Sequence, residues 1–250
     1  MGFSLVAWSE SLDTGGVLQE MVALKDQHVT TKGDDILVPS FAPNLIALYA
    51  LGATISQAQF STPSLRERSL IDISPIDINA KPASNPRIVD FVHSPITLTA
   101  GEGARFFVAE GADGAERETG LAWLQGEAED VPGGEIETIR CTATTTLTPY
   151  QWSLCELTLS QQLRAGKYAI VGMSAISAGA IAARLVIPGS AYRPGVIAFD
   201  AESDFGTTYG RYGGLGKWGE FEHVYPPQVE FLSVSADTSE VVYLDVIKVE

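Results

Sequence analysis

The sequence predicts an all-β protein, a sandwich or barrel built from short strands. Three observations lead there. Apolar and polar residues alternate over many short segments, roughly sixteen of them, spaced as in sandwiches and barrels. The 24 glycines and 13 prolines fall mostly between these segments, where turns are expected. No long stretch has the period of an amphipathic helix.

The first half contains strand candidates separated or entered by prolines. Because proline cannot donate to a β-ladder, these strands should begin, bulge or lie at a sheet edge where a proline occurs. The expected strands, in order, are Ile36–Val38, Leu45–Leu51, Ala53–Phe60, Leu70–Ile73, Arg87–Val92 and Arg105–Ala109.

The second half is less broken by proline, and its run Ile136–Thr148 is rich in Thr and Ile, which favour strands. A further strand is expected around Trp123. The remaining candidates are Ile136–Thr148, Leu154–Leu159, Tyr168–Val171, Ala180–Ile187, Gly195–Asp200, Val229–Ser235 and Val241–Val249. The last two flank the turn-like residues 236–239, which predicts a hairpin.

Helical signals are few. Ser64 and Glu67 have the spacing of a capping box, which predicts a turn or two of helix, and Leu159–Ala165 is a second short candidate. Two uncharged stretches, Phe41–Ala58 and Ile170–Ile187, are interrupted by Pro, Gly or Arg184 and fall short of about 20 apolar residues. Both are interpreted as buried strand pairs, and the N-terminus lacks the features of a signal peptide.

The stretch from Glu110 to Gly134 is acidic and rich in glycine, which is typical of a linker between domains. A boundary there gives an N-terminal β-sandwich over residues 1–110 and a C-terminal one over 111–250. A single large sandwich with long loops is the alternative.

Charge and cysteine content narrow the possible functions. The chain has 31 acidic and 16 basic residues, a formal charge of -15, and no basic arm at either end. Because nucleic-acid binding depends on Lys and Arg neutralising phosphates, direct contact with nucleic acid is not expected. Cys141 and Cys155 either pair across neighbouring strands or remain buried free thiols.

The segment Phe205–Tyr225 combines large aromatic side chains with glycines. Such segments present rigid contact surfaces, so it is predicted to be a subunit contact or a ligand-binding loop. A loop folded over its own core is the alternative. The candidate contact residues are Tyr209, Tyr212, Trp218, Phe221 and Tyr225. Within this segment, residues 214–219 match G-x-G-x-x-G, but no helix is expected after them, so no nucleotide site is predicted.

Candidates for metal binding and catalysis are weak. Asp200, Glu202 and Asp204 alternate at a strand end, where grouped carboxylates can bind calcium or simply face solvent. The three histidines are far apart in sequence, and Ser174 lies in an incomplete nucleophile-elbow pattern. No cofactor, no catalytic residue and no enzymatic activity are therefore predicted.

The succession of short strands, as in Lys167–Ile187 and Gly195–Asp200, resembles viral coat proteins of the jelly-roll type. With two sandwiches the chain is similar to the double jelly-roll major capsid proteins, although 250 residues are compact for two barrels. The resemblance implies tandem jelly rolls, a homotrimer that self-assembles, other capsid or membrane-associated proteins as partners, and a place in the virion after assembly in the host cytoplasm.

The leading hypothesis is thus a structural capsid protein. An acidic coat without a basic arm would need a membrane or a basic protein between shell and genome. The first alternative is a carbohydrate-binding β-sandwich that stacks sugars on Trp218, Tyr212 and Tyr209. The second is a hydrolase of unknown type.

Overall fold

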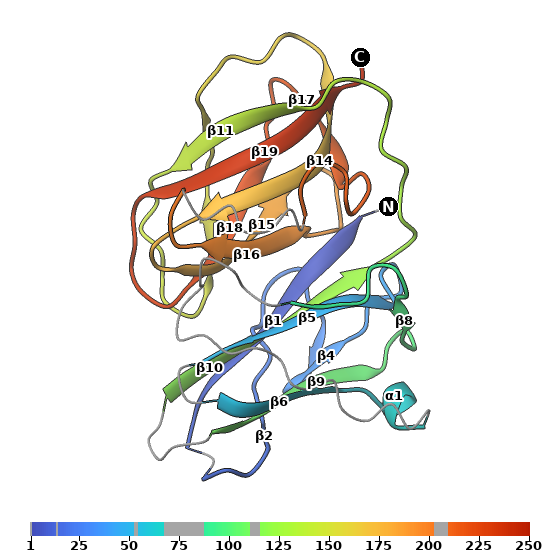
Figure 1. Ribbon diagram of the computed structural model, residues 1–250, viewed down its shortest axis with the longest axis vertical. Coiled ribbons are helices and arrows are strands. Elements are labelled where there is room, and N and C mark those ends of the chain that lie inside the picture. Colours follow the sequence, from blue (N-terminus) through green and yellow to red (C-terminus); the bar gives the residue numbers. More distant parts are fainter. Residues whose placement is uncertain (1, 14, 53–54, 68–87, 111–115, 203–209) are drawn as a thin grey trace. The chain divides into compact units, whose positions relative to one another are not determined.

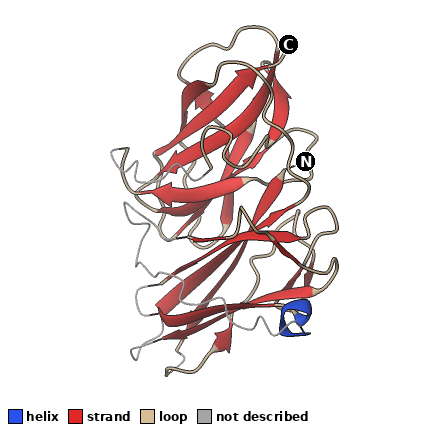
Figure 2. Cartoon of the chain, turned by 45° about the vertical axis from the view of Figure 1, so that its right-hand side comes forward, coloured by secondary structure: helices blue, strands red, loops and turns tan. Residues whose placement is uncertain are grey.

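The computed structural model describes residues 2–13, 15–52, 55–67, 88–110, 116–202 and 210–250. Almost all regular structure in these residues is β-strand (Figure 2), so the all-β prediction is confirmed. The described residues contain one helix, α1 (Pro63–Glu67). None of the described helical residues forms a segment long and apolar enough to cross a membrane.

The chain divides into two compact units. The N-terminal unit comprises the described residues between Leu5 and Gly126, and the C-terminal unit comprises Glu127–Glu250 together with the residues up to Ser4. A boundary at 110/111 would assign the strand around Trp123 to the C-terminal unit. That strand instead pairs with a strand of the N-terminal unit, with Trp123 opposite Ala47, so the units divide after Gly126.

Two sheets make up the N-terminal unit. The first has the order β1-β10-β5-β7, with β8 also on β5, and its strands are β1 (Phe3–Leu12), β10 (Glu116–Gln125), β5 (Asn44–Leu51), β7 (Val89–Asp90) and β8 (Ile96–Thr97). The second has the order β2-β9-β4-β3, with β6 also on β9, and its strands are β2 (Gln19–Glu20), β9 (Gly103–Glu110), β4 (Asp35–Leu37), β3 (Thr31–Lys32) and β6 (Ile55–Ser61).

The C-terminal unit repeats these strand orders on two sides, and a parallel pairing that places Ala175 opposite Ala198 joins the two sides into one nine-stranded sheet. One side has the order β13-β11-β19-β14-β17, in which Figure 1 shows β19 between β11 and β14; the strands are β13 (Thr158–Leu159), β11 (Glu137–Ala143), β19 (Glu240–Lys248), β14 (Lys167–Ile176) and β17 (Gly219–Glu222). The other has the order β12-β18-β15-β16, with β12 (Trp152–Cys155), β18 (Gln228–Ser233), β15 (Ala180–Val186) and β16 (Gly195–Phe199).

Both strand orders are those of a jelly roll, as predicted. In each unit the first strand pairs with the last, β1 with β10 and β11 with β19, and the last strand also pairs with the strand at the middle of the unit. The next strands inward, β2 with β9 and β12 with β18, pair on the opposite side of each unit. This nesting is the double-sheet arrangement that protects strand edges in antiparallel sandwiches.

The nested order explains why the predicted hairpin is wrong. β18 and β19 follow one another in the chain, but β18 pairs with β12 and β15 whereas β19 pairs with β11 and β14. The two uncharged stretches likewise form strands, β5 then β6 and β14 then β15, but in neither stretch does a strand pair with its successor. A jelly roll sends consecutive strands to opposite sides of the sandwich, so a turn signal does not imply pairing.

The structure tests both predicted short helices and confirms one of them. The helix at Pro63–Glu67 exists, but its first turn is capped by Thr62, whose Oγ1 accepts from the Leu65 N–H at 3.3 Å, while Ser64 binds Glu102. Proline follows the cap at the first helical position, where its missing N–H costs nothing. The second helical candidate, Leu159–Ala165, is wrong because this segment is strand β13 followed by bends. The strand expected at Leu70–Ile73 lies outside the described residues.

Candidate functional site

The aromatic-glycine segment of the C-terminal unit is described from Gly210 onward. It runs along the edge of β14, whose pairing with β19 is interrupted by a bulge between Ile170 and Gly172. The Met173 N–H donates to the Gly210 carbonyl at 2.8 Å, and the Trp218 N–H donates to the Ile170 carbonyl at 2.8 Å. The segment therefore takes up backbone groups of β14 that would otherwise lack partners.

A buried ion pair fixes this segment to the sheet. Asp245 on β19 is fully buried and accepts hydrogen bonds from Arg211 through both carboxylate oxygens. Oδ2 lies 2.5 Å from Arg211 Nε, and Oδ1 lies 2.8 Å from Arg211 Nη2. It also accepts from the Tyr212 N–H at 3.1 Å and from Thr138 Oγ1 at 2.7 Å. Burial opposes the charge of Arg211, but the bonds to Asp245 outweigh it and raise the pKa of the guanidinium.

Gly172 makes this close approach possible. A Cβ at this position would lie 2.7 Å from Asp245 Oδ2 and 2.8 Å from the Gly210 carbonyl oxygen. Both distances are shorter than any side chain tolerates, so a larger residue would push the segment away from β14.

Tyr212 is held in a strained conformation at the surface. Its φ is 53°, in the left-handed region that non-glycine residues rarely adopt. Its side chain is 55% exposed, and the Arg211 guanidinium lies 4.4 Å from the centre of its ring. The Arg211 guanidinium, which Asp245 holds in place, therefore packs against one face of the Tyr212 ring. This contact makes the ring a rigid and accessible aromatic surface.

The five predicted contact residues divide by exposure. Tyr212 and Tyr225 are exposed, at 55% and 69%. Trp218 and Phe221 are buried, Trp218 edge-on against Phe3 at 4.9 Å and Phe221 stacked on Tyr168 at 5.7 Å. Buried rings cannot meet a partner or stack on a sugar, so the contact surface is reduced to the two exposed tyrosines. Tyr209 lies outside the described residues.

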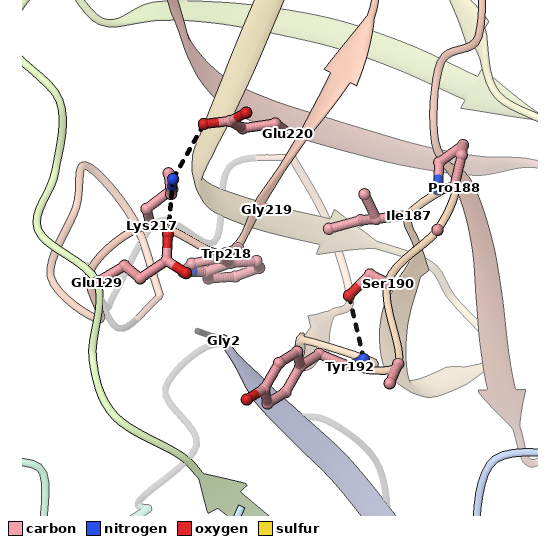
Figure 3. Close-up of a pocket in the computed structure, with 12 residues that line it drawn as sticks. Gly2, Glu129, Ile187, Pro188, Ser190, Tyr192, Lys217, Trp218, Gly219 and Glu220 are labelled. Atoms are coloured by element: carbon pink, nitrogen blue, oxygen red, sulfur yellow. Dashed lines mark hydrogen bonds and ion pairs between the residues drawn. The ribbon is translucent and has the colours of Figure 1, made fainter. Parts of the chain in front are cut away.

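A pocket of about 320 Å³ lies beside Trp218, within the C-terminal unit (Figure 3). Its walls come from the chain between Ile187 and Tyr192, from residues 217–220, and from Glu129 and Gly2. Sequence reasoning missed it because its walls come from four separate parts of the chain.

Lys217 is the central cation of this pocket. Its Nζ lies 2.6 Å from Glu129 Oε2 and 3.0 Å from Glu220 Oε1, and Glu220 also pairs with Lys167. The bonds to Glu129, and then to Glu220, raise the pKa of Lys217. The pKa of Glu129 is lowered, chiefly by Lys217, and that of Glu220 by Lys167 and then Lys217. These groups are therefore fully charged near neutral pH.

The structure describes only part of the weak metal candidate. Glu202 binds Arg140 at 2.6 Å and the Tyr243 hydroxyl at 2.8 Å, Asp200 directly follows β16, and Asp204 lies outside the described residues. Among the described residues no group of three or more His, Cys, Asp or Glu side chains is placed to hold a metal. Ser174 is buried in the middle of β14 rather than at a strand-to-helix turn.

The two cysteines are free thiols, both buried. Burial raises the pKa of Cys141 to about 12 and also raises the pKa of Cys155. A thiol is nucleophilic only as the thiolate, so both cysteines are structural core residues in this fold.

Comparison with known proteins assigns neither a family nor a function to the chain. No family model matches the chain, and the search of curated proteins finds no match. Among solved structures, the chain aligns with the major capsid protein P2 from bacteriophage PM2 at 11% identity and a TM-score of 0.24, over 99% of this chain and 98% of that one. At that TM-score the match carries no argument, so the function of this chain has to be inferred from its own strand order and side chains.

Proposed function

We propose that this chain is a coat protein that assembles with copies of itself into a viral shell and has no catalytic role. The observation that carries the proposal is the pair of tandem jelly rolls within one chain. The step from fold to function is made by analogy, because jelly rolls serve both as shell subunits and as binding domains.

The exposed tyrosines support an assembling role. A shell subunit needs contacts that are accessible and already ordered before assembly, since ordering a side chain on binding costs affinity. Tyr212 meets both conditions through Arg211 and Asp245. Tyr225 and its neighbour Val224, 59% exposed, lie in a turn closed by a 2.8 Å bond from the Tyr225 N–H to the Glu222 carbonyl. Aromatic side chains of this kind dominate the binding energy of interfaces.

The finer parts of the proposal are a homotrimer as the assembling unit and the virion as its location. The formal charge of -15 adds that the shell does not neutralise a genome by itself. A membrane or a separate basic protein is proposed to lie between the shell and the nucleic acid.

Light scattering on the purified chain, with negative-stain microscopy of the same fraction, tests the proposal. We expect a mass of three chains, or shells and sheets. Tyr212→Ala and Tyr225→Ala should each shift the equilibrium toward monomers at a given concentration, whereas Val17→Ala, at a 65% exposed position of the N-terminal unit, should not. A monomer at every concentration would overturn the coat function.

A further inference from the structure

One end of the C-terminal unit has a carboxyl group in its core. Glu240 is the first residue of β19 and lies opposite Ala143 of β11. Because side chains alternate along a strand, Glu240 shares the inward face of β19 with Val242 and Leu244, which are both buried. Glu240 itself is only 1% exposed. An acid thus occupies a position where the alternation of the strand predicts an apolar residue.

The ionised form of Glu240 meets no cation in this environment. Neither of its carboxyl oxygens has a hydrogen-bond partner of normal geometry among the described residues. The ionisable groups that face it are Asp237, whose negative charge opposes ionisation, and the Cys155 thiol of β12. Burial raises the pKa of Glu240 to about 7, and Asp237 adds to the shift, against the Ser177 hydroxyl and the Ser239 backbone. The folded unit therefore keeps Glu240 neutral almost up to neutral pH.

Three loops meet at this end of the unit. They are residues 144–148, 177–179 and 234–239. The Leu147 N–H donates to the Asp237 carbonyl at 2.9 Å. The Val234 N–H donates to the Gly179 carbonyl at 2.8 Å. Most side chains of these loops are exposed Ser and Thr, so little apolar burial holds the loops together. Segments of this kind open locally at a lower free energy than the whole unit unfolds.

Ser177 connects the buried acid to these loops. Its Oγ accepts from the Gly179 N–H at 3.1 Å and from the Ala180 N–H at 2.8 Å, which fixes the turn between β14 and β15. The same hydroxyl faces Glu240. A charge on Glu240 therefore acts on the 177–179 loop through Ser177, and on the 234–239 loop through Asp237.

We propose that Glu240 is a pH-sensitive switch, which keeps the three loops closed while it is protonated and opens them when it ionises. The buried carboxylate faces Asp237 and has no counter-charge, so only water can stabilise it. Water reaches it when the loops separate, and the strands beyond them stay paired. The switch does not depend on the coat function proposed above.

The direction of the pH effect follows from the two states. In the open state Glu240 is solvated and holds its proton with the ordinary affinity of a glutamate, whereas the closed state holds it more tightly. Opening therefore becomes easier as the pH rises from 4.5 to about 7, and levels off above that. Between pH 6 and 8 the equilibrium constant for opening should rise about tenfold.

The two cysteines provide the measurement. Burial raises the pKa of the Cys155 thiol, a bond to Thr145 opposes the shift, and the Glu240 carboxylate adds to it, so Cys155 lies beside the loops. Cys141 lies within β11, between β13 and β19, and becomes accessible only when those strands separate. Thiol labelling of the full chain, with each cysteine quantified by mass spectrometry, therefore distinguishes opening of the loops from unfolding of the unit.

The test compares the unaltered protein with Glu240→Gln, which keeps the shape of the side chain but cannot ionise. At each pH, the Cys155 labelling rate of the unaltered protein is divided by that of the variant, which cancels the pH dependence of thiol chemistry. This ratio should rise about tenfold between pH 6 and 8. Cys141 should stay much slower than Cys155 in both proteins, which also shows that the variant is folded.

Two further variants sharpen the assignment. Glu137→Gln removes an exposed acid at the other end of the same strand pair, opposite Val246, and should behave like the unaltered protein. Asp237→Asn removes the charge that faces Glu240, so its transition should move to lower pH. A ratio that does not change with pH would overturn the switch. So would equal labelling of Cys141 and Cys155, because the whole unit would then unfold instead of the loops opening.

Discussion

The two jelly rolls share a strand order but are stabilised by different kinds of contact. The N-terminal unit has an aromatic cluster in its core, in which Trp8, Phe60 and Phe106 lie with ring centres 5.7–6.4 Å apart. Its ion pair between Arg105 and Asp35 lies at the surface, with the Arg105 side chain 41% exposed.

The C-terminal unit has ion pairs that lie deeper in its core. Its pairs Arg211–Asp245 and Arg184–Glu230 are buried, and the Arg184 guanidinium also lies 4.0 Å from the ring of Trp152. The same topology is thus compatible with an ion pair near the surface or with ion pairs in the core, but a buried pair leaves a charge unpaired in the core if one partner is lost.

The largest effect is expected in the aromatic core. Phe106→Ala should destabilise the N-terminal unit by about 3–5 kcal/mol, because it removes a fully buried ring from the cluster with Trp8 and Phe60. Urea unfolding followed by tryptophan fluorescence measures this loss. Phe107→Ala, at the next residue of β9 and only half-buried, is the control and should cost clearly less. Equal losses would mean that the cluster has no special weight.

The buried ion pair should come next. Asp245→Asn leaves Arg211 buried without its counter-charge and should cost about 3 kcal/mol in the C-terminal unit. Thiol labelling of Cys141 and Cys155 reports this unit selectively, since the chain has no other cysteine. Adding Arg211→Met should recover part of the loss. No recovery would show that the remaining bonds of Asp245, to Tyr212 and Thr138, matter more than the charge.

A pH effect on stability is expected from Glu240 in the C-terminal unit. Burial raises the pKa of Glu240, 1% exposed, from 4.5 to about 7, and Asp237 adds to the shift while Ser177 and the Ser239 backbone oppose it. The folded state therefore holds this proton more tightly than the unfolded state. The resulting stabilisation is complete below pH 4.5 and is lost as the pH rises through about 7.

Thermal unfolding at several pH values checks this. The unaltered protein should lose on the order of 2 kcal/mol from this group between pH 5 and 8, whereas Glu240→Gln should lack that component. Glu202 provides an opposite control, because Arg140 and then Tyr243 lower its pKa. Its contribution is present above its ordinary pKa and is lost only toward acid pH. A profile of Glu240→Gln identical to that of the unaltered protein would contradict the assignment.

The smallest effect is expected at the surface pair of the N-terminal unit. Glu20 lies 3.6 Å from Arg105, and both side chains are substantially exposed, at 32% and 41%. Glu20→Gln should change stability by less than about 1 kcal/mol, because water screens such pairs. The same urea titration measures it. A loss as large as that of Asp245→Asn would remove the contrast between the two units.

Local signals in the sequence were sufficient for the fold class and for most strand positions. β5, β9, β15, β16, β18 and β19 all lie within a few residues of the segments expected from alternation and from Pro and Gly. These signals are local because a strand exposes alternate faces whatever its partner is. The first strand, β1 (Phe3–Leu12), was not expected, although its burial on both faces explains why it lacks clear alternation.

Strand pairing, by contrast, was decided only by the tertiary structure. The sequence indicated a hairpin for β18 and β19 and a boundary before the strand around Trp123, and both depend on partners distant in the chain. The candidate site shows the same limit. Trp218 is an aromatic residue among glycines, which suggests exposure, yet Phe3, more than 200 residues earlier, covers it. The sequence by itself determined which segments become strands, because that preference is local. Which strands meet, which rings are buried and where a pocket opens depend on long-range packing that no local pattern encodes.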